Sequence, residues 1–129
     1  MTTAGKAPPI GARQAPAAVI DRGYLERFTL GNIALEQEVL QLFAAQVPHY
    51  LDRLRQAATD ADWKAAAHTL KGSAAAIGAQ ALAHLAELAE QVDLSLAPAV
   101  RQAERELAER RIAEATEATC RHIGHLLGH

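Results

Sequence analysis

The sequence predicts an all-α fold, an antiparallel up-and-down four-helix bundle with an additional short N-terminal helix. Three observations lead to this prediction. Alanine, leucine, glutamate, arginine and glutamine, all strong helix formers, dominate the 129 residues. Apolar residues recur at intervals of three and four along most of the chain, as on the buried face of an amphipathic helix. Short turns separate these segments, and short connections favour antiparallel neighbours in a bundle.

The N-terminal segment lies outside the periodic pattern. Residues 1–18 contain Pro8, Pro9 and Pro16 together with two glycines. Proline- and glycine-rich segments do not propagate a helix and are typical of linkers. We therefore expect residues 1–18 to be a disordered leader and residues 19–127 to form the helical bundle domain. The leader and the free C-terminus favour a stand-alone protein over part of a larger hybrid.

Two helices are expected in the next part of the chain. A short one follows Asp21, whose side chain can cap it. Gly31 breaks the pattern, and Asn32 can cap a second, longer helix. The stripe of that second helix, apolar except for Gln46, comprises Leu35, Val39, Leu42, Phe43, Gln46, Tyr50, Leu51 and Leu54. Pro48 lies inside the stripe and predicts a kink, or, as the lesser alternative, two helices split at that point.

Three further helices are expected over residues 60–77, 80–91 and from near 95 to 126. Acidic residues open the first of them, where the helix dipole favours negative charge. Gly78 ends it, as glycine often does just past a helix. Pro98 is tolerated in the first turn of the last helix. That helix also carries a long charged stretch, which we interpret as a solvated face.

Composition excludes several classes of protein. The net charge of −2 gives no general electrostatic case for a nucleic-acid or anionic membrane partner. Cys120 is the only cysteine, so an intrachain disulfide cannot form and a cytosolic location fits. No apolar run approaches the roughly 20 residues that span a bilayer, and the layout of a secretory signal is missing. We therefore expect a cytoplasmic protein.

The helix expected over residues 60–77 presents one histidine to solvent. Its predicted buried stripe consists of Trp63, Ala67, Leu70, Ala74 and Ile77. At about 100° per residue, His68 points roughly 140° away from Trp63. Lys64 and Lys71 flank the histidine one turn before and one turn after it. The sequence thus predicts an exposed imidazole with two cationic neighbours.

Small residues continue the same exposed strip, namely Gly72, Ala75 and Ala61. Glycine inside a helix costs about 1 kcal/mol relative to alanine. Close approach of another molecule's backbone is one reason to place Gly72 there. The strip therefore combines a nucleophile with cations and little steric cover.

This combination suits phosphoryl transfer. An exposed imidazole is mostly neutral at pH 7, and its free nitrogen is a good nucleophile. The lysines can stabilise a phosphoryl group, which carries about two negative charges. Phosphoryl transfer depends mostly on positioning and electrostatics, so a rigid helix is a suitable mount. Without further context, however, an exposed histidine between lysines is usually just part of a polar helix face.

The segment Ala-His-Thr-Leu-Lys-Gly-Ser-Ala at 67–74, followed by Gly78, resembles the histidine phosphotransfer (HPt) domains of bacterial phosphorelays. That family's signature is a histidine, any residue, an apolar residue, then Lys-Gly-Ser/Ala, with a further glycine about six residues later. The similarity covers roughly residues 19–92. The last helix is similar only generically, and its charged stretch and histidine-bearing tail follow no family pattern.

The resemblance implies a phosphorelay intermediate. His68 would accept a phosphoryl group from the aspartate of one response-regulator receiver domain and pass it reversibly to the aspartate of another. Lys71 would stabilise the phosphoryl group, and Gly72 would leave room for the receiver to dock. Gly78 would allow the tight turn between the two central helices. The exposed strip adds Lys64 as a second stabilising cation, with Ala75 and Ala61 as docking residues.

The resemblance also implies what this chain lacks. Such a domain is a phosphoryl carrier without a kinase or nucleotide-binding domain, and the sequence has no glycine-rich phosphate loop. We expect no cofactor on this chain, since the Mg²⁺ that supports transfer would sit on the receiver. The expected partners are receiver domains and a sensor or hybrid histidine kinase, with no nucleic acid and no membrane. The family expectation is a monomer.

Two other classes of function remain as alternatives. One is a non-catalytic helical module that binds a receiver or dimerises through its long last helix. The other is a metal-binding bundle, suggested by the spacing of His122, His125 and His129. The paired Glu-x-x-His motifs of such bundles are missing. We therefore expect a frayed histidine-bearing tail and no metal.

Overall fold

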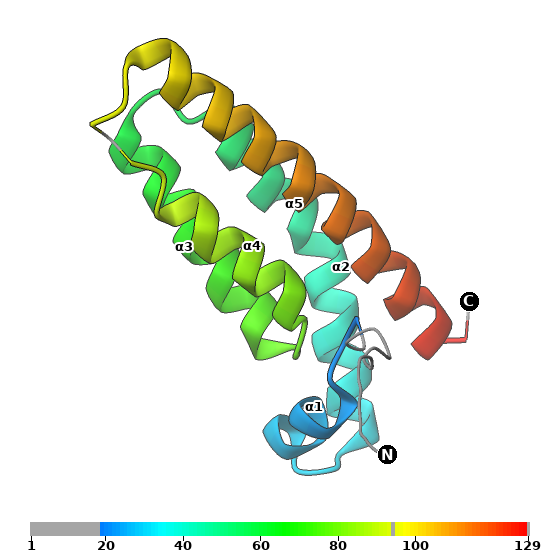
Figure 1. The fold of residues 1–129 in the computed structure, drawn as a ribbon. Coiled ribbons are helices and arrows are strands. Elements are labelled where there is room, and N and C mark those ends of the chain that lie inside the picture. The colour runs from blue at the N-terminus through cyan, green and yellow to red at the C-terminus, as the bar shows by residue number, and fades with distance from the viewer. Residues whose placement is uncertain (1–18, 94, 129) are drawn as a thin grey trace, which may run out of the picture.

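The computed structural model describes residues 19–93 and 95–128, and this part of the chain is helical without strands. Its helices are α1 (Arg22–Thr29), α2 (Ile33–Arg55), α3 (Asp60–Ala76), α4 (Gln80–Glu90) and α5 (Pro98–Leu126). Figure 1 shows α2 to α5 running alternately up and down as a bundle, with α1 at one end. The predicted all-α bundle with a short N-terminal helix is confirmed. The leader expected over 1–18 lies outside the described residues.

Side-chain caps determine where the first three helices begin. The Asp21, Asn32 and Thr59 side chains each accept a 3.0 Å hydrogen bond from the backbone N–H group three residues later. Such a bond satisfies one of the four N–H groups that a helix start leaves unpaired. The last helix instead begins with Pro98, which has no N–H group to satisfy.

One expectation about helix limits is wrong, and one alternative is excluded. Helix α2 continues through Pro48, so the alternative of two helices split there is excluded. Helix α5 begins at Pro98 rather than near 95, because the Asp93 carboxylate accepts bonds from the backbone N–H (2.8 Å) and hydroxyl (2.7 Å) of Ser95 and closes a turn. Helix α5 ends at Leu126, which confirms the expected limit, and His122 and His125 therefore lie in the helix and not in a frayed tail.

The core forms where the four long helices meet. The large side chains buried in this core include Leu40, Phe43, Val47, Leu54, Trp63, Leu70, Ile77, Leu82, Ile112 and Ile123, and Ile20 and Leu25 pack against them from the N-terminal side. All five residues of the stripe predicted on α3 are at most 2% exposed, which confirms that prediction. On α2, by contrast, Leu35 and Leu42 are 39% and 60% exposed. These two leucines belong to the surface because the apolar face of α2 is wider than its contact with the bundle.

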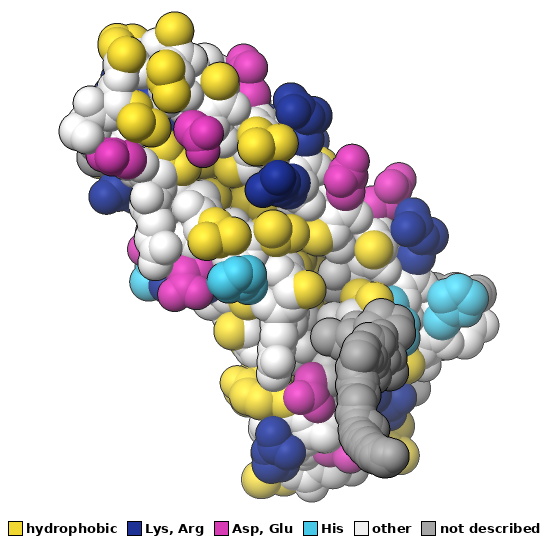
Figure 2. Space-filling model, viewed as in Figure 1, with side chains coloured by type: hydrophobic (Ala, Val, Ile, Leu, Met, Phe, Trp, Pro, Cys, Tyr) yellow, Lys and Arg dark blue, Asp and Glu magenta, His cyan; other side chains and the backbone are white. Residues whose placement is uncertain are grey.

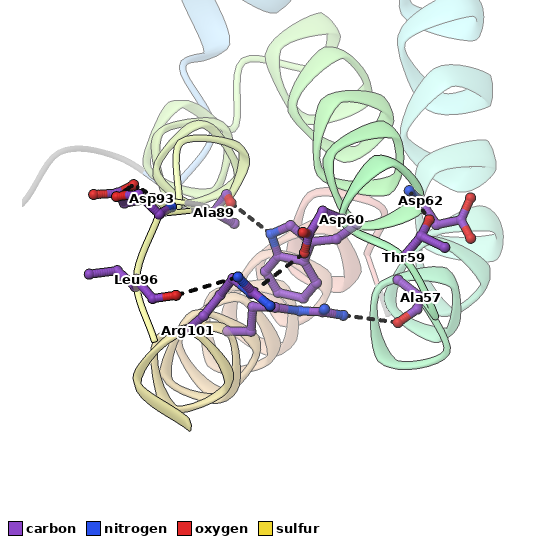
Figure 3. Close-up of polar contacts among 11 residues, drawn as sticks. Ala57, Thr59, Asp60, Asp62, Ala89, Asp93, Leu96 and Arg101 are labelled. Carbon is purple, nitrogen blue, oxygen red and sulfur yellow. Dashed lines mark hydrogen bonds and ion pairs between the residues drawn. The ribbon is translucent and has the colours of Figure 1, made fainter. Parts of the chain in front are cut away.

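A cluster around Trp63 fixes α3 against α4 and α5. The indole Nε1 donates a 2.8 Å hydrogen bond to the backbone oxygen of Ala89 in α4. The guanidinium of Arg105 lies 4.5 Å from the indole centroid, a cation–π distance, and donates to the Ala57 oxygen at 3.0 Å. Figure 3 shows the hydrogen bonds that reach the backbone oxygens of Ala89 and Ala57 in this region. The cluster therefore fixes the positions of α3, α4, α5 and the α2–α3 loop relative to one another.

The turn between α3 and α4 depends on Gly78. Its φ of +78° belongs to the left-handed region, which side chains other than glycine rarely adopt. A Cβ atom at this position would also lie 2.8 Å from the backbone oxygen of Asp21. The Asp21 N–H group donates a 2.9 Å bond to the Gly78 oxygen, and Ile20 beside it is fully buried. The segment before α1 therefore packs directly on this turn.

Among the described residues, no helix is both long enough and apolar enough to cross a membrane.

Candidate functional site

His68 lies on the solvent side of α3, and its side chain is 67% exposed. The ring does not project freely. Its Nδ1 atom lies 3.0 Å from Oε2 of Glu90, the last residue of α4. The second ring nitrogen, Nε2, has no hydrogen bond within the described part of the chain. One nitrogen is thus held by the protein while the other is available to a partner.

Glu90 also binds the predicted cation Lys71. The Lys71 Nζ atom lies 3.0 Å from Oε1 of Glu90, so the two carboxylate oxygens hold two different α3 side chains. The hydrogen bond from Lys71, supported by the one from His68, keeps the pKa of Glu90 below its ordinary value against the opposing effect of desolvation. An ionised carboxylate can only accept hydrogen bonds. In the neutral ring, the Nδ1 atom of His68 therefore carries the proton, and Nε2 carries the lone pair.

Sequence reasoning missed Glu90. The helical period relates residues within one helix, whereas Glu90 is 22 residues from His68 and on another helix. One signal was present. In two antiparallel helices joined by a tight turn, residues equidistant from the turn face each other. Residue 79 is midway between 68 and 90, so the Gly78 turn places these two residues side by side.

The two lysines differ in whether their side chains are held by an ion pair. Lys71 is held by Glu90 beside the ring, with its side chain 31% exposed. Lys64 is exposed one turn before His68 and forms no ion pair within residues 19–93 and 95–128. Only Lys71 is thus fixed at the histidine, whereas Lys64 contributes positive charge to the same face.

The small residues of the strip are exposed as a group. Gly72, Ala75 and Ala61 all face solvent on α3. A Cβ atom built on Gly72 would meet nothing within 4 Å. Packing within the chain therefore does not require a glycine here, although glycine costs a helix about 1 kcal/mol relative to alanine.

An apolar groove runs between α2 and this part of α3. Its lining comes from α2 and from the end of α3 with the residue that follows it, and comprises Val39, Leu42, Phe43, Gln46, Tyr50, Ser73, Ala76 and Ile77. Ser73, the residue after Gly72, lines one end of the groove in the order of the chain, and the exposed Leu42 forms part of its α2 wall. A partner that covered His68 could therefore also bury apolar surface on α2.

Among the residues that the structure describes, the other histidines and the cysteine form no comparable site. His84 on α4 is 66% exposed and lies 3.8 Å from Glu87. His122 and His125 lie on α5, whereas His129 is outside the described residues. Within the described chain, no three potential metal ligands gather in one place. Partial burial raises the pKa of the Cys120 thiol, which opposes formation of a reactive thiolate.

Comparison with models of protein families matches the Hpt domain to residues 38–124, about two thirds of the chain. The match begins inside α2 and ends close to the end of α5. It therefore includes most of the last helix, which the sequence alone related to the family only generically. Searches of curated proteins and of solved structures give no significant match.

Proposed function

The chain belongs to the Hpt-domain family, whose members are phosphocarrier modules that interact with receiver domains and kinases in phosphorelays, and from this premise we propose that His68 is its phosphoryl-accepting residue. The observation that carries the proposal is the bond between Nδ1 and Glu90. It leaves Nε2 as an exposed nucleophile beside Lys71. We further propose that residues 19–127 form the functional domain and that it works in the cytoplasm.

The proposed step begins with a phospho-aspartate on a receiver domain. The lone pair of His68 Nε2 attacks the phosphorus atom, and an N–P bond forms as the P–O bond to the aspartate breaks. The aspartate leaves as a carboxylate with the electron pair of the broken bond. The ring keeps its Nδ1 proton and becomes positively charged, and the Glu90 carboxylate stabilises that charge.

The same arrangement supports the return step. A positively charged imidazole is a good leaving group because it departs from phosphorus as a neutral ring. When a second receiver presents its aspartate, the carboxylate attacks the phosphorus and the N–P bond breaks. Nδ1 keeps its proton throughout, with the Glu90 carboxylate as the hydrogen-bond acceptor, so neither direction requires a proton to leave the site. The chain thus acts as a carrier that can be loaded and unloaded.

Lys71 is the proposed partner of the phosphoryl oxygens. Its ammonium group already lies beside the ring, where it is held by Glu90 at 3.0 Å. Once a phosphoryl group with about two negative charges is attached, Lys71 can share its three donors between Glu90 and the phosphoryl oxygens. Lys64 would add charge from the other side. We propose that this chain binds no metal and that Mg²⁺ enters with the receiver.

The proposed docking surface is the exposed strip of α3 together with the groove beside it. Gly72, Ala75 and Ala61 present almost no side-chain bulk, so a receiver can bring its phosphorylated aspartate close to the helix backbone. The apolar walls of the α2–α3 groove add contact area next to the reacting atoms. Response-regulator receivers and the receiver of a hybrid kinase are the partners that this surface would accept.

The decisive experiment mixes a radiolabelled phospho-receiver and Mg²⁺ with the protein. We expect wild-type protein to gain label that is stable in base and labile in acid, as phosphohistidine is. His68→Gln should gain none while its helical circular dichroism is unchanged. His84→Gln is the matched control, because His84 is equally exposed and also lies next to a glutamate.

Two outcomes would overturn the proposal. Label on His68→Gln would show that another residue is the acceptor. If no receiver from the same organism labels the wild type although one binds it, the chain is a receiver-binding module without phosphoryl transfer.

A further inference from the structure

A second apolar surface lies between α4 and α5, outside the histidine site. Its lining includes Leu85, Leu88, Val92, Leu107 and Ala108, and no residue of α3 contributes to it. Leu88 is 46% exposed, and Val100 at the start of α5 is 49% exposed. Figure 2 shows this face, with hydrophobic side chains gathered in a hollow over α4 and α5 and charged side chains along its α5 edge. These two apolar side chains are thus left largely uncovered by the described part of the chain.

Two charged residues in the lining indicate what covers this surface. Glu104 and Arg111 are seven residues apart on α5, two helical turns or about 10.5 Å along the axis. Leu107 and Ala108 lie between them on the same side. Within the described residues, the side chains of Glu104 and Arg111 form no ion pair and no hydrogen bond. Opposite unpaired charges thus stand symmetrically about the midpoint of an apolar stretch.

This pattern is complementary to itself. If a second copy of α5 lies antiparallel across the first, the residue at position i faces the residue at position 215 − i about an axis between Leu107 and Ala108. Glu104 of each copy then faces Arg111 of the other, and both ion pairs form together. A two-fold interface requires this kind of self-complementarity, in which residue i meets j and j meets i. A parallel arrangement in register would instead bring like charges together.

We propose that the α4–α5 face is a homodimer interface, formed by two antiparallel copies of α5 about a two-fold axis near Leu107 and Ala108. The apolar stretch supplies the buried centre, and the pairs of Glu104 with Arg111 supply orientation and specificity. Leu88 and Val100 are the exposed apolar side chains that the second copy covers. His68 lies outside this surface, so each copy keeps its phosphoryl site. This proposal departs from the monomer expected from the sequence and does not depend on the proposed phosphoryl transfer.

Charge reversal provides the test, because each substitution acts twice across a two-fold axis. Sedimentation equilibrium of the full chain should show a monomer–dimer equilibrium in the micromolar range. Glu104→Arg or Arg111→Glu alone turns both ion pairs into repulsive pairs, and each should weaken dimerisation by about tenfold or more. The double variant Glu104→Arg/Arg111→Glu restores both pairs and should dimerise like the wild type. An equimolar mixture of the two single variants should form the heterodimer.

Arg110→Glu is the matched control. It makes the same change of charge one residue away, but about 100° around the helix, on the side of α5 that faces Arg55 of α2. Dimerisation of this variant should equal that of the wild type. A wild type that stays monomeric at high micromolar concentration would overturn the proposal. The proposal would also be overturned if the double variant dimerised no more tightly than the two single variants. The same holds if Arg110→Glu weakened dimerisation as much as Arg111→Glu does.

Discussion

The two sides of α3 are held by consecutive residues of α4 in contrasting ways. On the buried side, the Trp63 indole donates a 2.8 Å bond to the backbone oxygen of Ala89, and Trp63 is 1% exposed. On the solvent side, the His68 ring lies 3.0 Å from the side-chain carboxylate of Glu90 and is 67% exposed. The first acceptor is neutral and fixed by the helix, whereas the second is charged and can respond to a change of charge on its partner.

A single alignment of α4 against α3 serves both stability and reactivity. Ala89 and Glu90 are neighbours, so the contact that sets the depth of Trp63 in the core also sets the position of Glu90 beside the histidine. A buried bond to a backbone oxygen is rigid and permits one arrangement. An exposed bond to a carboxylate contributes little to stability but fixes the protonated nitrogen of the ring. Substitutions on each side should therefore separate unfolding from phosphoryl transfer.

The largest expected effect is on the buried side. Trp63→Ala removes the indole from the core, leaves the Ala89 oxygen without its donor, and removes the surface on which Arg105 stacks. Truncations of buried aromatic residues cost about 3–5 kcal/mol, and we expect a loss in this range in urea unfolding. His68→Gln, on the solvent side, should change the free energy of unfolding by less than about 0.5 kcal/mol. Similar unfolding midpoints for the two variants would contradict the view that the buried side of α3 supplies stability and the solvent side does not.

Much of the contrast could be predicted from the sequence. The buried stripe that begins at Trp63 and the exposure of His68 both follow from the helical period, because every residue involved lies on the same helix. The starts of the first three helices follow from the capping side chains. The relation between His68 and Glu90 could not be predicted in this way, because it depends on how two helices align across the Gly78 turn. For the same reason, nothing in the periodicity of α3 indicates that Lys71 is held and Lys64 is not.

A smaller effect is expected on the solvent side from Glu90→Gln. The amide keeps the size of the side chain but removes the negative charge that stabilises a positively charged phosphohistidine ring. The fraction of phosphoryl group on His68 at equilibrium with a receiver should fall by up to about fivefold, as expected for an exposed charge pair. The free energy of unfolding should hardly change. Quantifying label on both proteins after equilibration measures the shift, and an unchanged distribution would show that Glu90 does not stabilise the charged ring.

The smallest effect is expected from Gly72→Ala, which should raise the free energy of unfolding while weakening docking of the receiver. The added methyl group meets nothing within 4 Å in the chain, so the only internal consequence is a better helix former at an interior position. We expect the protein to gain up to about 1 kcal/mol of stability. The methyl group would, however, stand on the proposed docking strip one turn from His68. Labelling by a phospho-receiver should therefore slow severalfold at low receiver concentration.

Gly124→Ala is the matched control for this prediction. Gly124 also lies inside a helix, α5, and its added Cβ would likewise meet nothing within 4 Å. Both variants should gain similar stability, but only Gly72→Ala should require more receiver to reach half the maximal rate of labelling. The maximal rate itself should hold, because the methyl group obstructs docking and touches neither Glu90 nor the reacting nitrogen. Equal labelling of the two variants at every receiver concentration would place the receiver elsewhere. A gain in stability together with weaker docking would instead show that α3 sacrifices stability at Gly72 so that a partner can bind. Trp63 has the opposite role, because it stabilises the fold on the buried side of the same helix.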